Sequence, residues 1–173
     1  MLKFVAMLAM LILADGQPAR ADSNVASLHM AEAQLVGKAR LKYLAWSVYD
    51  AELYAPKGQW RADQPFALTL NYLRAFTAKE LAQSSVDEMR KQGYNNEAIL
   101  ANWQRQLESI LPNVSARTTI TGVRDRNGHA VFYRNGSRIG SIKNREFARR
   151  FFDIWLGSRV SYPGIRNKLI GNS

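Results

Sequence analysis

The chain has 173 residues and no Cys, with 24 Lys and Arg against 14 Asp and Glu and with two His. These counts fit one ordinary domain and exclude a disulfide scaffold, a Cys-based metal site and a thiol nucleophile, and they leave little for an imidazole metal site. The net charge of +10 admits nucleic acid, an anionic membrane surface or acidic ligands as partners without choosing among them.

The first residues have the pattern of an export signal. Lys3 precedes an apolar run over residues 4–14, and Ala19 and Ala21 are the small residues that a signal peptidase reads. The run is shorter than the roughly 20 apolar residues of a membrane-spanning helix. We therefore expect residues 1–21 to be a signal peptide cleaved after Ala21, and residues 22–173 to be one domain in the periplasm.

This location bears on the positive charge. Nucleic acid is scarce in the periplasm, so we expect a solvated basic surface and no nucleic-acid partner. A weak contact with an anionic membrane surface stays open.

Three strands are expected next. The first begins near Gln34 and includes Tyr43, the second runs over about residues 46–54, and the third runs from Phe66 to Leu73, after Pro65. In the first strand, Leu35, Ala39, Leu41 and Tyr43 share one face, and Val36, Lys38, Arg40 and Lys42 share the other. In the third strand, alternate apolar residues form a core face.

Two helices follow the third strand. Thr77 and Glu80 have the spacing of a capping box, which predicts a helix from there to about Gln92. Asn96 can cap the next helix, whose apolar stripe ends at Pro112. The second of these helices is expected to cover the sheet.

The clearest local signal is a pair of Asn-Gly dipeptides, at residues 127–128 and 135–136. Asn-Gly favours the type I′ turn, so residues 118–142 are predicted to form a three-stranded antiparallel meander. Asn144 can cap a further helix that ends near Gly157, and a short helix ending at Gly171 closes the chain. The order of elements indicates an α+β domain with helices packed on a large antiparallel sheet.

Few residues point to catalysis or to metal binding. His29 lies in a poorly patterned segment and His129 follows a turn, so both are expected to be solvated, and no Ser–His–acid site is predicted. Asp50 and Glu52 share a strand face without a visible partner, which argues against a carboxylate-pair hydrolase. No metal and no cofactor are expected.

The remaining candidates are arginines beside aromatic residues. Arg40 is near Tyr49 along the chain, and Arg74 follows Tyr72 at the end of the third strand. A guanidinium keeps its charge even when buried, so either Arg could hold a carboxylate or polarise a carbonyl. The alternative is that each Arg reaches into solvent or pairs with an acidic neighbour.

Several stretches resemble the bacterial exported members of the chalcone isomerase-like superfamily. They span most of the expected mature domain, in order, and cover residues 36–56, 70–74 (Leu-Asn-Tyr-Leu-Arg), 87–93, 120–123, 131–136, 139–142 and 151–156. The resemblance implies an open-faced β-sandwich, in which an antiparallel sheet is covered by a layer of helices with a ligand cleft between them.

The resemblance also implies roles for residues. In the plant isomerases an Arg stabilises oxyanions during ring closure, and in the fatty-acid-binding branch a corresponding Arg holds a carboxylate. Arg40 is the candidate for that position, and Arg74, Tyr49 and Tyr72 are candidates for ligand contacts. The catalytic Thr of the plant enzymes aligns with Leu44, which cannot donate a hydrogen bond.

Two functions from different classes follow. The first is a noncatalytic periplasmic binder of a small amphipathic ligand such as a fatty acid. The second is an isomerase, an intramolecular lyase acting on a phenolic enone, with Arg40 as the electrostatic catalyst. The Leu at the Thr position favours the binder, because binding needs an anchor and walls but no transition-state donor.

Overall fold

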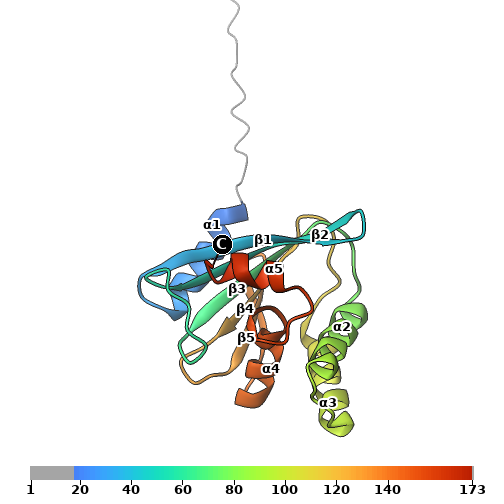
Figure 1. Ribbon diagram of the computed structural model, residues 1–173. Helices are drawn as coiled ribbons and strands as arrows, with labels where there is room; N and C mark the ends of the chain where they lie inside the picture. The colour runs from blue at the N-terminus through green and yellow to red at the C-terminus, as the bar shows by residue number, and fades with distance from the viewer. Residues whose placement is uncertain (1–17, 173) are drawn as a thin grey trace, which may run out of the picture.

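The computed structural model describes residues 18–172 of the chain (Figure 1). Most of the expected signal peptide, residues 1–17, lies outside the described residues. Residues 18–172 include one antiparallel sheet of six strands in the order of the sequence, each strand pairing with the next. The strands are β1 (Ala33–Tyr43), β2 (Trp46–Pro56), β3 (Phe66–Tyr72), β4 (Thr119–Arg124), β5 (Ala130–Arg134) and β6 (Ser137–Ile142).

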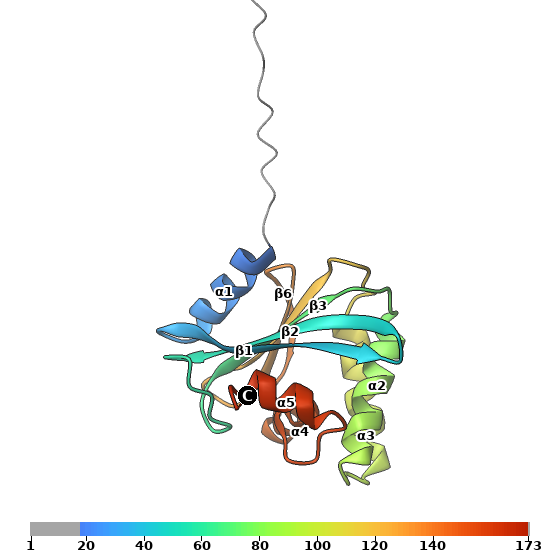
Figure 2. The ribbon, with the colours of Figure 1, turned by 45° about the horizontal axis from the view of Figure 1, so that its top comes forward.

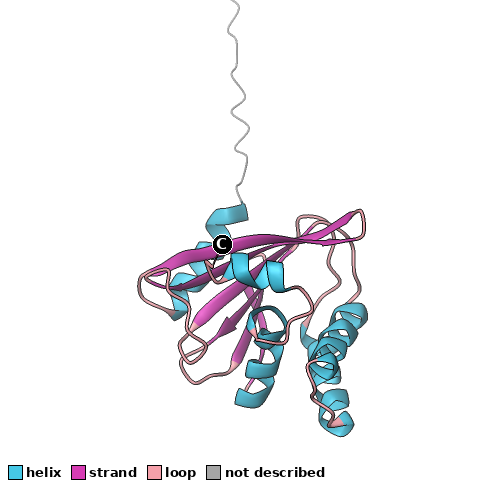
Figure 3. Cartoon of the chain, in the orientation of Figure 1, coloured by secondary structure: helices cyan, strands magenta, loops and turns pink. Residues whose placement is uncertain are grey.

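Helices lie on both faces of this sheet. They are α1 (Pro18–His29), α2 (Ala78–Lys91), α3 (Glu97–Ile110), α4 (Arg145–Leu156) and α5 (Pro163–Leu169). Figure 2 shows α1 on one side of the long β1–β2 hairpin and α4 and α5 on the other, and Figure 3 shows the same layers by element type. The α+β architecture predicted from the sequence is therefore confirmed.

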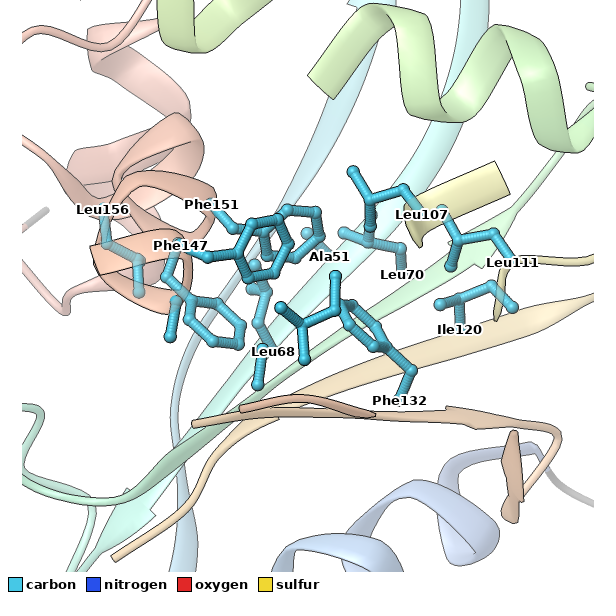
Figure 4. Close-up of a cluster of buried hydrophobic side chains, with 14 of the residues drawn as sticks. Ala51, Leu68, Leu70, Leu107, Leu111, Ile120, Phe132, Phe147, Phe151 and Leu156 are labelled. Carbon is cyan, nitrogen blue, oxygen red and sulfur yellow. The ribbon is translucent and has the colours of Figure 1, made fainter. Parts of the chain in front are cut away.

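The main core lies between the sheet and the layer formed by α2, α3, α4 and α5. Leu68 and Leu70 of β3 and Phe132 of β5 meet Phe147 and Phe151 of α4, and all five are buried (Figure 4). Aromatic rings meet edge to face here, with 5.3 Å between the centroids of Phe132 and Phe151. Burial of these large side chains is the dominant stabilising contribution to the fold.

The predicted helix caps are present. The Thr77 hydroxyl accepts from the backbone of Glu80 while the Glu80 carboxylate accepts from the backbone of Thr77. The side chains of Asn96 and Asn144 each accept a hydrogen bond from the third helical amide. These bonds satisfy backbone donors that have no partner inside the helix, which is why α2, α3 and α4 begin where the sequence predicted.

The meander over β4, β5 and β6 is confirmed, but only one of its turns has the expected type. Asn135 and Gly136 both have positive φ, of 47° and 83°, as a type I′ turn requires. In the other turn only Gly128 has a positive φ, of 77°, and its N–H donates a hydrogen bond to the carbonyl of Asp125. That turn is a type I turn followed by a left-handed Gly, so the type I′ prediction for residues 127–128 was wrong.

The alternation predicted for the first strand was also wrong at its start. The pairing of β1 with β2 shifts between Leu35 and Gly37, which marks a β-bulge. The extra residue turns Val36 toward the core, and Leu35 is left 45% exposed. A bulge of one residue exchanges the faces of the residues on one side of it.

The segment around His29, which has no clear pattern in the sequence, is helical and packs on the sheet. Val25, Ala26 and Met30, at the end of α1 and just beyond it, are buried against the face of the sheet opposite the main core. His29 Nε2 lies 2.6 Å from the Tyr133 hydroxyl, and the ring is half-buried. His29 is therefore a packing residue of α1, and its predicted solvation was wrong.

Candidate functional site

A cavity of about 440 Å³ lies between the sheet and the helical layer, on the side of α2 and α4. The β1–β2 hairpin supplies Leu41, Val48 and Tyr49, and the other strands supply Leu70, Tyr72 and Ile120. The remaining lining comes from helices and connecting segments: Phe76, Glu80, Leu81, Ser84, Ser85, Glu88, Leu111, Phe151, Ile154, Trp155, Tyr162 and Ile165. Most of these side chains are apolar, as in a site for a small organic ligand.

Two tyrosines provide polar groups deep in the cavity. Tyr49 and Tyr72 are opposite each other on β2 and β3, with ring centroids 5.9 Å apart. The Tyr49 hydroxyl accepts a hydrogen bond from Trp155 Nε1 at 2.8 Å, which leaves its own proton free to donate. Within residues 18–172 the Tyr72 hydroxyl has no hydrogen-bond partner.

Burial determines the protonation state of these phenols. It raises the pKa of Tyr49 and of Tyr72 well above the ordinary value, because a phenolate would lose its hydration. For Tyr49 the hydrogen bond from Trp155 acts in the opposite direction and is outweighed. Both side chains are therefore neutral hydrogen-bonding groups at physiological pH.

The charged residues of the lining are acidic. Glu88 accepts from Lys91 on one carboxylate oxygen, at 2.7 Å, and from the Ser161 hydroxyl on the other. Glu80 lies closer to solvent, and one of its oxygens serves the capping box of α2. Among the described residues that line the cavity there is no Lys, Arg or His.

The structure places Arg40 on the opposite face of the sheet. Arg40 pairs in register with Asp50, and the next pair, Leu41 with Tyr49, faces the cavity. Successive residues of a strand point to opposite faces, so Arg40 points away from the cavity. Its guanidinium binds the Asp50 carboxylate through two hydrogen bonds of 2.6 and 2.7 Å, and its side chain is 51% exposed.

Arg74 does not line the cavity either. Its guanidinium carbon lies 4.4 Å from the centroid of the Trp46 ring, in an exposed cation–π contact. Of the four site residues predicted from the sequence, the structure thus brings Tyr49 and Tyr72 together in the cavity and leaves Arg40 and Arg74 outside it.

The helical contributions to the cavity were missed. Leu81, Ser84, Ser85 and Glu88 recur at the i, i+3, i+4, i+7 spacing of one helical face, and this face of α2 lines the cavity. The face has few large apolar residues, which the sequence did show. A helix that cannot fill its side of the core with large side chains leaves space there. The small number of large apolar residues on this face of α2 could therefore have predicted the cavity.

Comparisons with known proteins place this geometry in context. A family model described as chalcone isomerase-like matches residues 22–171. A crystal structure of a fatty-acid binding protein from Arabidopsis thaliana superposes with a TM-score of 0.63 at 16% sequence identity, covering 83% of this chain and 89% of that one. No curated protein sequence matches the chain.

Proposed function

Because the chain belongs to the chalcone isomerase-like family, we propose that it is a noncatalytic binder of a small amphipathic ligand, held in the cavity between the sheet and α2 and α4. The observation that carries the proposal is an apolar cavity of about 440 Å³ with two neutral phenols in its wall. Ligand sites in proteins commonly have volumes of roughly 300–1,000 Å³ and a few convergent polar groups. The shared fold with a fatty-acid binding protein supports this function.

The polar groups of the cavity also bear on the ligand's head group. A carboxylate in this cavity would meet Tyr hydroxyls but no cation from the described lining. Each oxygen of Glu88 already accepts a hydrogen bond, from Lys91 or from Ser161, and the charge of Lys91 weakens the attraction of Glu88 for an ammonium head. Burying an unpaired charge is costly, and we therefore expect an uncharged head that accepts a hydrogen bond from Tyr49 to bind most tightly. A fatty acid, which has a charged carboxylate head, is therefore expected to bind less tightly than a ligand with an uncharged head.

The alternative hypothesis, that the protein is an isomerase, has less support from the structure. Ring closure through a phenolate needs a positive group at the developing oxyanion, and Arg40 was the residue expected to supply it. Arg40 lies on the other face of the sheet, and Leu44 stands in the β1–β2 turn with no hydroxyl to offer. Among the described residues, the lining of the cavity thus supplies walls and hydrogen-bonding groups but not the positive group that this alternative requires.

We also propose that the protein acts after export to the periplasm, as the Lys3 and Ala19-Arg20-Ala21 pattern predicts. The family match begins at Asp22, the residue after the expected cleavage point, which supports this division of the chain. Mass spectrometry of the N-terminus of protein from a periplasmic fraction tests it. An intact Met1 or an N-terminus far from Asp22 would contradict it.

Across residues 18–172, every helix is too short or too polar to cross a bilayer.

Competition binding tests the ligand proposal. Decanol, decanoate and decylamine should displace the neutral dye N-phenylnaphthylamine, with decanol at least about tenfold tighter than decanoate because its head carries no charge to desolvate. Failure of all three compounds to displace the dye would contradict the ligand function. Tighter binding of decanoate would contradict only the expected head group.

Matched variants locate the binding site. Ser85→Phe adds a ring to the cavity wall, and Gln83→Phe adds the same ring to the exposed side of the same helix. We expect Ser85→Phe to weaken decanol binding at least about tenfold and Gln83→Phe to leave it unchanged, since only the first ring occupies ligand space. Equal affinities for both variants and the wild type would place the ligand elsewhere.

A further inference from the structure

The turn of the β1–β2 hairpin projects beyond the rest of the sheet. β3 pairs with β2 only from Tyr49 onward, so residues 42–47 have no strand beside them other than each other. We call these residues the hairpin tip. Figure 1 and Figure 2 show the paired ends of β1 and β2 reaching past β3.

The hairpin tip is the most apolar exposed surface of the described residues. Tyr43, Leu44 and Trp46 are 60%, 83% and 59% exposed, and they account for three of the six large hydrophobic residues left in solvent. Single exposed apolar residues are common, but a cluster of this kind marks an interaction site.

The backbone conformation of the turn also indicates that the hairpin tip is an interaction site. Leu44 has a φ of 53°, the left-handed region in which Asn or Gly is favoured and Leu is strained. Folding alone would favour a polar turn residue here. Leu44, which is 83% exposed, therefore has no role in packing the domain, and we look for its role in an interaction with another molecule.

Cations flank the apolar residues of the tip. Lys42 is exposed at its base, and the Arg74 guanidinium lies over the Trp46 ring. Neither cation has a carboxylate partner within residues 18–172, and no acidic residue occurs among residues 41–48. The surface is thus complementary to one that is apolar inside and anionic at its edge.

We propose that the hairpin tip inserts into the headgroup region of an anionic lipid bilayer. Trp and Tyr rings favour this depth, because one part of each ring is apolar and another part forms hydrogen bonds. Lys42 and Arg74 would then lie at the level of the lipid phosphates. A protein partner fits less well, since a stable protein interface buries roughly 800 Å² on each side and a single projecting turn offers less.

The tip is continuous with the wall of the cavity. Leu41 and Val48, immediately before and after it, both line the cavity. Insertion of the tip would bring this wall against the bilayer surface, where amphipathic molecules are dissolved. The membrane contact does not depend on the identity of the cavity ligand.

Vesicle binding tests the proposal. The purified protein is sedimented with vesicles of phosphatidylcholine, with and without phosphatidylglycerol, at low and high salt. We expect binding to the anionic vesicles that weakens as ionic strength rises and screens the cations. The double variant Leu44→Asn, Trp46→Ala should bind at least about tenfold more weakly, because it loses the apolar groups that enter the bilayer.

Leu28→Asn is the matched control, because Leu28 is 73% exposed on α1, away from the tip. It should bind vesicles as the wild type does. Leu44→Asn suits the left-handed turn, so urea denaturation of this single variant should show no loss of stability and separates membrane binding from folding. Absence of wild-type binding, full binding by the double variant, or an equal loss in Leu28→Asn would each overturn the proposal.

Discussion

Tyr49 and Arg40 lie on neighbouring strands of one hairpin and have opposite surroundings. The hydroxyl of Tyr49 is enclosed in the cavity and accepts from Trp155, whereas Arg40 and Asp50 form an exposed ion pair on the other face. Exposed ion pairs contribute little to stability, and nothing connects this one to the cavity. Substituting each of the two residues therefore tests directly which side chain contacts the ligand.

Tyr49→Phe should weaken decanol binding several-fold and lower the unfolding free energy by about 1–3 kcal/mol, because Trp155 Nε1 is left without its acceptor. Arg40→Ala should leave decanol binding unchanged and the midpoint of urea denaturation close to that of the wild type. Competition binding and denaturation measure both effects. Normal binding by Tyr49→Phe together with a large loss in Arg40→Ala would restore the Arg assignment that the family resemblance implies.

His29 gives the domain a predicted dependence on pH. Burial lowers the pKa of His29 below its ordinary value; Asp125 acts against this shift and Arg138 adds to it. In the window between the lowered pKa and about 6.5, the unfolded chain binds more protons than the folded one, so stability rises with pH there. Below that window the full penalty of protonating a half-buried ring, 2.6 Å from the Tyr133 hydroxyl, applies.

The measurement is the free energy of unfolding in urea between about pH 7.5 and pH 5, on either side of the ordinary His pKa. We expect the wild type to lose stability as the pH falls and His29→Asn to lose less. If the free energy of unfolding depends on pH in the same way in both proteins, protonation of His29 does not cause the loss of stability.

At the level of elements, the packing of α5 on β1 depends on a Gly. A Cβ on Gly37 would lie 2.0 Å from the carbonyl oxygen of Lys168 and 2.7 Å from that of Leu169, closer than atoms can approach. Gly37 follows the β-bulge, where the strand comes directly against the end of α5. The need for Gly at this position is therefore one of space rather than of backbone conformation.

Gly37→Ala should lower the unfolding free energy by about 1–3 kcal/mol, because α5 must move away from the sheet. Gly164→Ala is the control within α5, since nothing lies within 4 Å of its added Cβ. Ala is also the better helix former, so this variant should be as stable as the wild type or more stable. Equal denaturation curves for Gly37→Ala and the wild type would show that α5 is not held by this contact.

The same elements show how far the sequence alone reaches. The caps at Thr77, Asn96 and Asn144 and the turn at Asn135 are local signals, and the structure has them. The β1 bulge was missed, and the close approach of α5 to Gly37 could not be predicted because α5 is distant along the chain. Helix α1 was missed because its buried face is short and meets a sheet formed by later residues.

The site was only half predictable for a related reason. Tyr49 and Tyr72 were identified as aromatic neighbours of Arg40 and Arg74, and the pairing of β2 with β3 brings the two tyrosines together. Arg40 was chosen from its aromatic neighbours and from the family resemblance. It faces away from the cavity because the pairing of β1 with β2 shifts between Leu41 and Lys42, which places Tyr49 opposite Leu41 instead of opposite Arg40. The contribution of Trp155 needs the placement of α4, which no local pattern in the sequence provides.

At the scale of the whole molecule, the β1–β2 hairpin has two roles. Its base forms the wall of the cavity through Leu41 and Val48, and its tip exposes Leu44 and Trp46. If the cavity holds an amphipathic ligand and the tip enters a bilayer, the ligand can pass between them without crossing bulk water. Avoiding water matters because exposure of an alkyl chain costs about 0.8 kcal/mol for each CH₂ group.

This arrangement predicts the kinetics of ligand transfer. A fluorescent alkyl ligand loaded on the wild-type protein should move to anionic vesicles at a rate that increases with vesicle concentration, because transfer takes place during collision with the membrane. The double variant Leu44→Asn, Trp46→Ala should release the same ligand at a slower rate that does not depend on vesicle concentration, because release into water then limits transfer. Stopped-flow fluorescence measures both rates, and Leu28→Asn should behave as the wild type. A wild-type rate that is independent of vesicle concentration would separate the cavity from the hairpin tip and show that the ligand leaves through water.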